Sequence, residues 1–244
     1  EAQATNTDSS TSTGHYYSDD QGNWYYKDAN GENLKGAQTI DGQNVYFRDN
    51  GQQVKGGLAK PNGFLDRYYD VDSGDLWTNR YVEFNGNWYY LGNDGKPVTG
   101  AQTINGQEVF FHRYHGFQIK GDFAGYYSEV STDGNYYDGQ TGDKVTHKGF
   151  VQRKLGDWFY LDDKGDKVMG LQTIDGKLYY FTASGASKYI QYGKQVKGEA
   201  ISFVNNSKYA PVYGVGTNDK VTQRYYFDEN TGEAVKNRYI YDRG

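Results

Sequence analysis

The sequence has no cysteine, only three prolines and a single methionine among its 244 residues. Without cysteine, no disulfide can brace the fold and no thiolate can bind a metal. Aliphatic side chains are also scarce, because hydrophobic residues of every kind make up 36% of the chain and the mean hydropathy is −0.94. We therefore do not expect one thick aliphatic core, and a thin structure that packs side chains between neighbouring repeats fits better.

A basic patch and a long apolar run are missing as well. The net charge is −5 and the pI is near 5.4, so nucleic acid is not an expected partner. No apolar stretch approaches the length that spans a bilayer, so membrane insertion is not expected. The sequence thus excludes two broad classes of partner, nucleic acid and the bilayer interior.

The first 14 residues, EAQATNTDSSTSTG, contain little that could be buried. A segment so rich in serine and threonine is typical of a flexible linker. We therefore divide the chain into a linker over residues 1–14 and a repeat domain over residues 15–244.

Aromatic residues and glycine are abundant: the chain contains 26 tyrosines and 33 glycines. Three related stretches contain the motif Gln-Thr-Ile followed by Asp-Gly or Asn-Gly and then an aromatic strand; they are Ala37–Gly56, Ala101–Gly121 and Leu171–Gly198. An Asx-Gly pair between two short strands predicts a β-hairpin with a type I′ turn, because glycine tolerates the positive φ that this turn requires. Each stretch is therefore predicted to be a hairpin that is closed by a Val-Lys-Gly or Ile-Lys-Gly strand.

A longer period contains these hairpins. Trp24, Trp88 and Trp158 are 64 and 70 residues apart, and the glutamines of the Gln-Thr-Ile motifs repeat the same spacing. No helical periodicity of any length is visible. We therefore predict an all-β fold, a β-solenoid of stacked short β-hairpins in three super-repeats.

Catalytic and metal-binding patterns are not found in the sequence. Nearly all carboxylates lie in predicted turns, where Asp caps its own backbone, and no nucleophile elbow, phosphate loop or zinc motif is present. The segment from Asp70 resembles the start of a calcium loop, but its twelfth residue is Tyr81, where a bidentate Glu is required. The four histidines form no ligand pattern. We expect no catalytic residue, no metal and no cofactor.

Binding is better supported than catalysis. Each hairpin could present an aromatic ring, a glutamine amide and a lysine ammonium together, which is a chemistry suited to an uncharged sugar. Alternatively, the ring packs on the next hairpin and the lysine stem covers it. Sequence reasoning leaves these two alternatives open, and it favours a packing role over a ligand role for Trp24, Trp88 and Trp158.

At these residues the chain resembles a known family. The patterns GNWYY, QTI-(D/N)G and (V/I)-KG are similar to the glucan-binding repeats of glucansucrases from lactic acid bacteria, from Tyr16 to the C-terminus. The resemblance implies non-catalytic pockets for α-glucan, built from a stacking ring, the Gln of QTI and a Lys of the closing strand. The residues implied are Gln38, Tyr46 and Lys55 for pocket one, Gln102, Phe110 and Lys120 for pocket two, and Gln172, Tyr180 and Lys197 for pocket three.

Two departures from the family pattern affect these pockets. Phe110 lacks the tyrosine hydroxyl, which weakens pocket two, and the insertion Ser187–Tyr192 reshapes or blocks pocket three. The catalytic barrel of the family is absent, so sucrose chemistry is not expected of this chain, although the parent enzyme would be a sucrose-dependent glucosyltransferase. The implied partners are isomaltooligosaccharides and dextran, bound by an extracellular or cell-surface monomer.

Two other functions stay open. Choline-binding repeats share the WYY hairpins, but the tryptophan that would wall a cation–π cage after the repeat's glycine is missing. A structural spacer without sugar affinity would carry the same hairpins. A wall anchor of the choline type and a spacer are therefore the alternatives to glucan binding.

Overall fold

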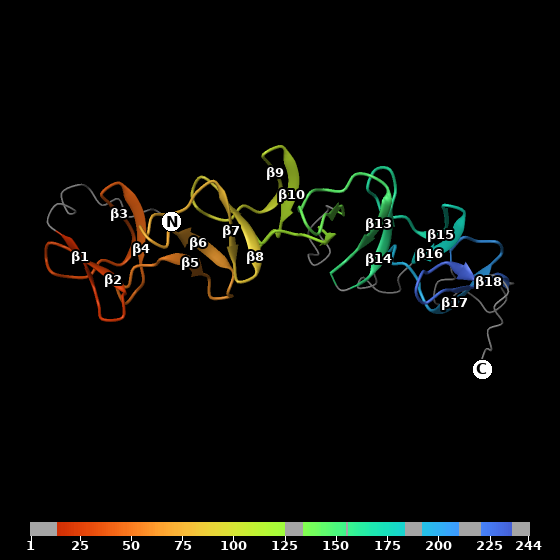
Figure 1. Cartoon of the computed structure of the whole chain (residues 1–244), viewed down its shortest axis with the longest axis horizontal. Helices are drawn as coiled ribbons and strands as arrows, with labels where there is room; N and C mark the ends of the chain where they lie inside the picture. The colour runs from red at the N-terminus through yellow and green to blue at the C-terminus, as the bar shows by residue number, and fades with distance from the viewer. Residues whose placement is uncertain (1–13, 125–133, 155, 184–191, 210–220, 236–244) are drawn as a thin grey trace. The chain divides into compact units, whose positions relative to one another are not determined.

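The computed structural model describes residues 14–124, 134–154, 156–183, 192–209 and 221–235 (Figure 1). Every regular element among these residues is a β-strand, which confirms the predicted all-β class. Residues 1–13 of the expected linker lie outside the described residues. The chain divides into two compact units, Glu1–Ile119 and Lys120–Gly244.

Short antiparallel strands make up the first unit. They are β1 (His15–Ser18), β2 (Trp24–Lys27), β3 (Gly36–Ile40), β4 (Gln43–Phe47), β5 (Gly56–Ala59), β6 (Leu65–Tyr69), β7 (Arg80–Phe84), β8 (Asn87–Leu91), β9 (Gly100–Ile104) and β10 (Gln107–Phe111). Each strand pairs with its neighbour in sequence, so the unit is a series of two-stranded hairpins. Figure 1 shows β7 and β8 as one such hairpin.

The second unit follows the same plan. Its strands are β11 (Asp122–Phe123), β12 (Tyr136–Tyr137), β13 (Gly149–Gln152), β14 (Trp158–Leu161), β15 (Gly170–Ile174), β16 (Lys177–Phe181), β17 (Glu199–Val204), β18 (Val221–Phe227) and β19 (Ala234–Val235). The last three form one three-stranded sheet, and the others pair as hairpins.

The predicted type I′ turns are confirmed. Between β3 and β4, Asp41 has φ 50° and Gly42 has φ 78°, and Asp175 and Gly176 between β15 and β16 have φ 50° and 78°. Positive φ at both central residues matches the twist of the flanking strands. The turn also fixes the register. It places Ile40 opposite Gln43, and each earlier residue of β3 is then opposite the next residue of β4.

Successive hairpins are joined by backbone hydrogen bonds. After each hairpin the chain returns and pairs with a strand of an earlier one: the Gln53 amide donates to the Trp24 carbonyl at 2.7 Å, and the Gln195 amide donates to the Trp158 carbonyl at 2.8 Å. Each of these bonds lies within one unit, so backbone hydrogen bonds contribute to the contact between successive hairpins.

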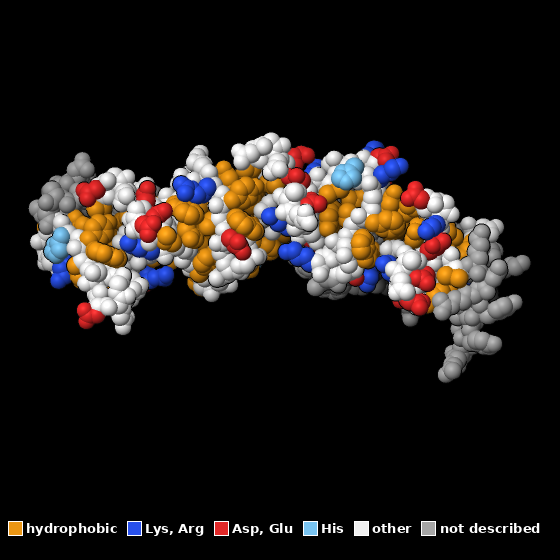
Figure 2. All heavy atoms as spheres, in the orientation of Figure 1, with side chains coloured by type: hydrophobic (Ala, Val, Ile, Leu, Met, Phe, Trp, Pro, Cys, Tyr) orange, Lys and Arg blue, Asp and Glu red, His pale blue; other side chains and the backbone are white. Residues whose placement is uncertain are grey.

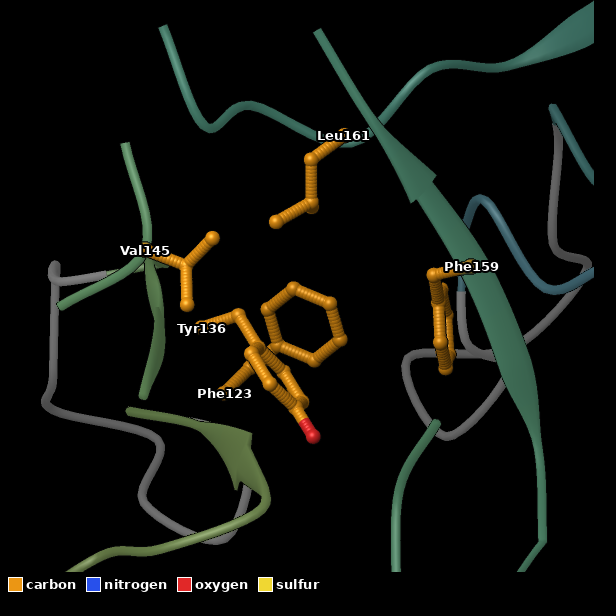
Figure 3. Close-up of a cluster of buried hydrophobic side chains, with 5 residues drawn as sticks. All are labelled: Phe123, Tyr136, Val145, Phe159 and Leu161. Carbon is orange, nitrogen blue, oxygen red and sulfur yellow. The ribbon is translucent and has the colours of Figure 1, made fainter. Parts of the chain in front are cut away.

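Several small cores replace a single large one. Figure 3 shows Phe123, Tyr136, Val145, Phe159 and Leu161 pointing toward one another in the second unit. The Phe123 and Phe159 rings meet edge to face, with centroids 4.9 Å apart and an interplanar angle of 72°. Burying one such ring stabilises a fold by about 1.5–3 kcal/mol. The expected packing of aromatic side chains between repeats is therefore found.

The surface carries charges of both signs. On the face shown in Figure 2, acidic and basic side chains are interspersed among hydrophobic ones. The part of the chain that the structure describes contains no helix with the length and apolarity needed to cross a membrane. It also contains no group of three or more side chains arranged to hold a metal ion.

Candidate functional site

The strand register separates the predicted pocket residues. Gln38 lies opposite Val45, whereas Tyr46 lies opposite Ala37. Directly opposed residues share a face of a hairpin and successive residues alternate between faces, so Gln38 and Tyr46 point to opposite faces. The other two hairpins have the same register, with Gln102 opposite Val109 and Gln172 opposite Tyr179. Placing the Gln and the ring on one face was therefore wrong in all three hairpins.

The predicted stacking rings are largely core residues. Phe110 is 3% exposed and Tyr180 is 4% exposed. Tyr180 packs against Phe203 and Phe227, with ring centroids 5.1 and 6.0 Å away. An open stacking position is thus wrong for Phe110 and Tyr180, and burial of the ring in the protein is what the structure shows.

Tyr46 is intermediate in exposure and packs against a small core. Its ring centroid lies 6.1 Å from that of Tyr69, with Val54 and Leu58 in the same cluster. The cavity beside Gln38 has a volume of about 20 Å³. That space suits one water molecule rather than a sugar. Pocket one, as predicted, is not open in this structure.

The three glutamines share a local structural role. The Nε2 atoms of Gln38, Gln102 and Gln172 each donate to the carbonyl three residues earlier, at 2.9, 2.9 and 2.8 Å. Such a bond fixes the chain as it enters the hairpin, since a side chain substitutes for a backbone partner. The amide nitrogen is therefore engaged in the turn.

The predicted closing strands are not formed, because Lys55, Lys120 and Lys197 lie outside the strands, and two of these lysines meet tryptophans instead. Lys55 Nζ lies 5.5 Å from the Trp24 ring centroid and donates to the Asp72 carbonyl at 2.7 Å. Lys197 Nζ lies 5.3 Å from the Trp158 centroid and donates to a carbonyl at 3.1 Å, that of Asn230. Each ammonium thus links an earlier indole to a later turn by a cation–π contact and a hydrogen bond.

Lys120 resembles the other two lysines in one contact. Its Nζ lies 3.5 Å from the Gln140 carbonyl within the second unit. Gln102 and Phe110 belong to the first unit, whereas Lys120 belongs to the second.

The tryptophans are more open than a packing role predicts. Trp24 and Trp88 are each 39% exposed, and Trp158 is intermediate in exposure. An indole that is partly buried and partly open can hold its own position and still contact a ligand. The favoured packing role therefore applies only to the buried part of each indole, because the rest is exposed to solvent.

A cavity of about 330 Å³ lies beside Trp158 in the second unit, and we call it the Trp158 cleft. It is lined by Gly156, Asp157, Trp158, Thr182, Lys194, Gln195, Val196, Lys197 and Glu199. Ligand pockets range from roughly 300 to 1,000 Å³, so the cleft has room for a small sugar. One indole, one hydroxyl and four charged side chains give it an apolar wall and a polar rim.

Two of the four charged side chains that line the cleft, Asp157 and Lys194, pair with each other. Lys194 Nζ lies 3.3 Å from Asp157 Oδ1, and Arg153 Nη1 lies 3.6 Å from Asp157 Oδ2. Arg153 itself is buried and forms a fork with Asp122, at 2.7 Å from Nε to Oδ1 and 3.3 Å from Nη2 to Oδ2. Burial lowers the pKa of the neighbouring Lys167, and the charge of Arg153 lowers it further. The rim is therefore locally balanced in charge.

The first unit has a corresponding surface of Asn23, Trp24, Gln52 and Lys55, which we call the Trp24 surface. There Gln52 Nε2 donates to Asn23 Oδ1 at 2.8 Å, at the place where Lys194 meets Asp157 in the second unit. A neutral amide pair thus stands where the Trp158 cleft has an ion pair.

Sequence reasoning missed Trp158, Lys194 and Asp157 as site residues. It grouped each lysine with a ring of its own hairpin, because strand alternation and the family resemblance both indicated that set. The equal spacing of the tryptophans and of the QTI motifs was a signal that could have linked them. Of the insertion Ser187–Tyr192, residues 187–191 lie outside the described residues, and Tyr192 is 42% exposed.

Comparison with known proteins gives two kinds of match. The family model described as a choline-binding repeat matches residues 34–81, and that of a putative cell wall binding repeat matches residues 79–96 and 169–187. Glucosyltransferase-S of Streptococcus mutans serotype c is 35% identical over 226 residues, which is 92% of this chain and 13% of that protein. Glucosyltransferase-I of Streptococcus downei is 34% identical over 256 residues, covering 93% of this chain and 16% of that protein.

Matches among solved structures include an alternansucrase in complex with isomaltononaose and a modular autolysin from Streptococcus pneumoniae. The alternansucrase is 28% identical with a TM-score of 0.27 and covers 91% of this chain and 18% of its own. The autolysin is 18% identical with a TM-score of 0.45 and covers 78% of this chain and 41% of its own. Scores this low establish no shared arrangement of the hairpins.

The glucosyltransferase matches extend over nearly the whole chain, yet the chain spans only 13% and 16% of the length of these two relatives. The matching family models describe binding repeats and no catalytic domain. The chain is thus similar, over nearly its whole length, to a region that makes up a small part of these streptococcal glucosyltransferases, and the family models that match it are those of binding repeats.

Proposed function

We propose that this chain binds α-glucan and that the Trp158 cleft is its main sugar site. The observation that carries the proposal is the open cavity of about 330 Å³ with an indole on one side and a polar rim on the other. The exposed part of the Trp158 indole would pack against the C–H groups of a pyranose beside the Lys197 ammonium, which lies over the ring at 5.3 Å, while hydroxyl, ammonium and carboxylate groups bond the sugar hydroxyls. Since Lys194 and Asp157 pair with each other, the cleft suits an uncharged ligand.

The repeated tryptophans extend this proposal to a polymer. The Trp24 surface and Trp88 each offer a partly exposed indole. Several weak sites on one chain raise the overall affinity for a polymer, because the second contact is intramolecular. We propose that residues 15–244 act as one β-solenoid repeat domain, extracellular or at the cell surface, that holds dextran-like chains for a sucrose-dependent parent enzyme. A monomer without nucleic-acid partners is part of the same proposal.

Affinity electrophoresis in dextran gels tests the main site. Trp158→Ala is expected to weaken retardation by about tenfold in apparent affinity, the size of one lost aromatic contact. Tyr114→Ala is the matched control, because Tyr114 is 59% exposed and lies outside the cleft. Unretarded wild-type protein would contradict glucan binding, and equal effects of the two variants would contradict the assignment of the cleft.

The second candidate function is a choline-type wall anchor, which the match of the choline-binding repeat model to residues 34–81 favours. Within that range the Tyr68 and Trp77 rings lie 4.5 Å apart, and the Arg80 guanidinium carbon lies 4.6 Å from the Trp77 centroid. A quaternary ammonium would have to displace this guanidinium from the ring face. Retention on a tertiary-amine column with elution by choline would support the anchor over glucan binding.

A further inference from the structure

A buried arginine lies behind the rim of the Trp158 cleft. The side chain of Arg153 is 1% exposed and lies between Asp122 and Asp157. Burying a guanidinium is costly unless its charge is neutralised and its N–H groups are hydrogen-bonded. The two hydrogen bonds to Asp122 offset most of this cost. A buried ion pair is weak support for stability in itself, so the position of Arg153 points to another role.

Four side chains of alternating charge connect the interior to the cleft. Asp122 contacts Arg153, Arg153 contacts Asp157, and Asp157 contacts Lys194, with N–O distances of 2.7, 3.6 and 3.3 Å. The Lys194 side chain is 49% exposed. A lysine this open would sample many rotamers without a fixed partner. The series therefore restrains the Lys194 ammonium, which would otherwise move freely, beside the Asp157 carboxylate at the cavity.

The first unit shows what the same turn does without the arginine. The Asp19 amide bonds the Asn23 carbonyl at 2.9 Å, as the Arg153 amide bonds the Asp157 carbonyl at 2.8 Å. Asp19 therefore stands at the position of Arg153, and its carboxylate accepts bonds from its own turn, at 3.0 and 2.9 Å from the Gln21 and Asn23 amides. The Trp24 surface accordingly keeps its neutral amide pair.

We propose that Arg153 is a positioning residue for the Trp158 cleft. It fixes Asp157 and, through Asp157, Lys194, so that one acceptor and one donor face two adjacent hydroxyl groups of a single pyranose ring. Charge-assisted hydrogen bonds are stronger than neutral ones, so the cleft prefers a sugar unit with a free vicinal diol. This inference rests on the proposed function of the cleft.

The test replaces the buried pair by apolar residues. The double variant Asp122→Leu/Arg153→Met removes both charges, an exchange that often leaves stability unchanged. Calorimetric titration with isomaltotriose is expected to show about fivefold weaker binding than wild type, since charge-assisted bonds lose their alignment. The surface variant Asp157→Asn breaks the series without touching the buried pair, and it is expected to give a similar loss even if the double variant does not fold.

Lys194→Ala separates positioning from a general structural effect. In the wild-type background it is expected to weaken binding several-fold, and in the Asp157→Asn background to add little, because the ammonium is already unaligned. Additive losses would overturn the positioning role, as would wild-type affinity of Asp157→Asn together with a strong loss in Trp158→Ala. The latter pattern leaves glucan binding intact, whereas failure of wild type to bind isomaltotriose would overturn both proposals.

Discussion

The Trp24 surface and the Trp158 cleft share a framework and differ at the rim. In both, a lysine ammonium lies over an indole, at 5.5 and 5.3 Å, and donates to a later carbonyl. In both, the backbone of the returning strand bonds the carbonyl of the tryptophan. The rim of the first is an Asn23–Gln52 amide pair, and that of the second is the Asp157–Lys194 ion pair.

This difference shows which positions the fold leaves open to change. Backbone bonds and buried rings such as Phe47 and Phe181, each 0% exposed, hold the hairpins. The rim side chains, Asn23 and Gln52 in one unit and Asp157 and Lys194 in the other, lie outside these buried cores. Copies of one repeat can therefore keep their architecture while their rims diverge in charge.

The largest expected effect tests whether the two cores are equivalent. Phe47→Ala and Phe181→Ala each remove a fully buried ring at matching positions of β4 and β16. Each is expected to lower the free energy of unfolding by about 3–5 kcal/mol. Urea denaturation followed by near-UV circular dichroism measures this loss. A cost below about 1 kcal/mol for either variant would show that its hairpin is not held by a comparable core.

The lysine contacts give the next largest effect. Lys55→Ala and Lys197→Ala each remove a cation–π contact and a hydrogen bond, and each is expected to cost about 1 kcal/mol. Thermal unfolding of the two variants measures the effect. Exchange of the same lysines for methionine keeps the alkyl stem, so a similar loss in Lys55→Met would assign the effect to the charge rather than to packing.

Exchanging the rims sharpens the comparison directly. Asn23→Asp/Gln52→Lys places the ion pair of the second unit on the Trp24 surface, and Asp157→Asn/Lys194→Gln makes the reverse change. Dextran affinity is expected to rise about twofold in the first and to fall about fivefold in the second, because charge-assisted bonds are stronger. Titration with isomaltotriose supplies the numbers. A fall in affinity for the first variant and a rise for the second would show that charge at the rim opposes sugar binding.

The smallest expected effect concerns a turn in the first unit. His112 Nδ1 accepts from the Tyr114 and His115 amides at 3.3 and 3.1 Å, whereas Asp138 in the second unit accepts from the amides two and three residues later at 2.8 and 2.9 Å. Burial lowers the pKa of His112, and the His115 charge lowers it further. The neutral imidazole is therefore the form that the folded state favours.

The sign of the pH dependence follows from that direction. The stabilisation is fully present above the unfolded pKa of His, about 6.5, and is lost as pH falls through the lower folded pKa. His112→Asp is expected to remove this loss, because Asp caps the equivalent turn in the second unit. Stability measured between pH 7 and 5 in wild type and variant gives the comparison, and identical slopes would exclude His112 as the group responsible.

Much of the fold could be predicted from local sequence. Asp41-Gly42 and Asp175-Gly176 specify their turns, and alternation specifies which side chains share a face. The face error at Gln38 was avoidable, because a two-residue turn at Asp41-Gly42 already places Gln38 opposite Val45. The contact between Lys197 and Trp158 was harder to predict, since it depends on how one hairpin docks on another. The Asp122–Arg153 pair left no local signal, because its members are 31 residues apart in sequence.

The clamp between each lysine, an earlier indole and a later carbonyl has a genetic consequence. Its reach is local: Lys55 meets Trp24 behind it and Asp72 ahead of it, and nothing more distant is required. A gene that encodes such units can gain or lose one unit by unequal recombination, and the lysine contacts in the remaining units can still form. Length is therefore the trait that selection can adjust in a single step, whereas a new ligand specificity needs point changes beside one tryptophan.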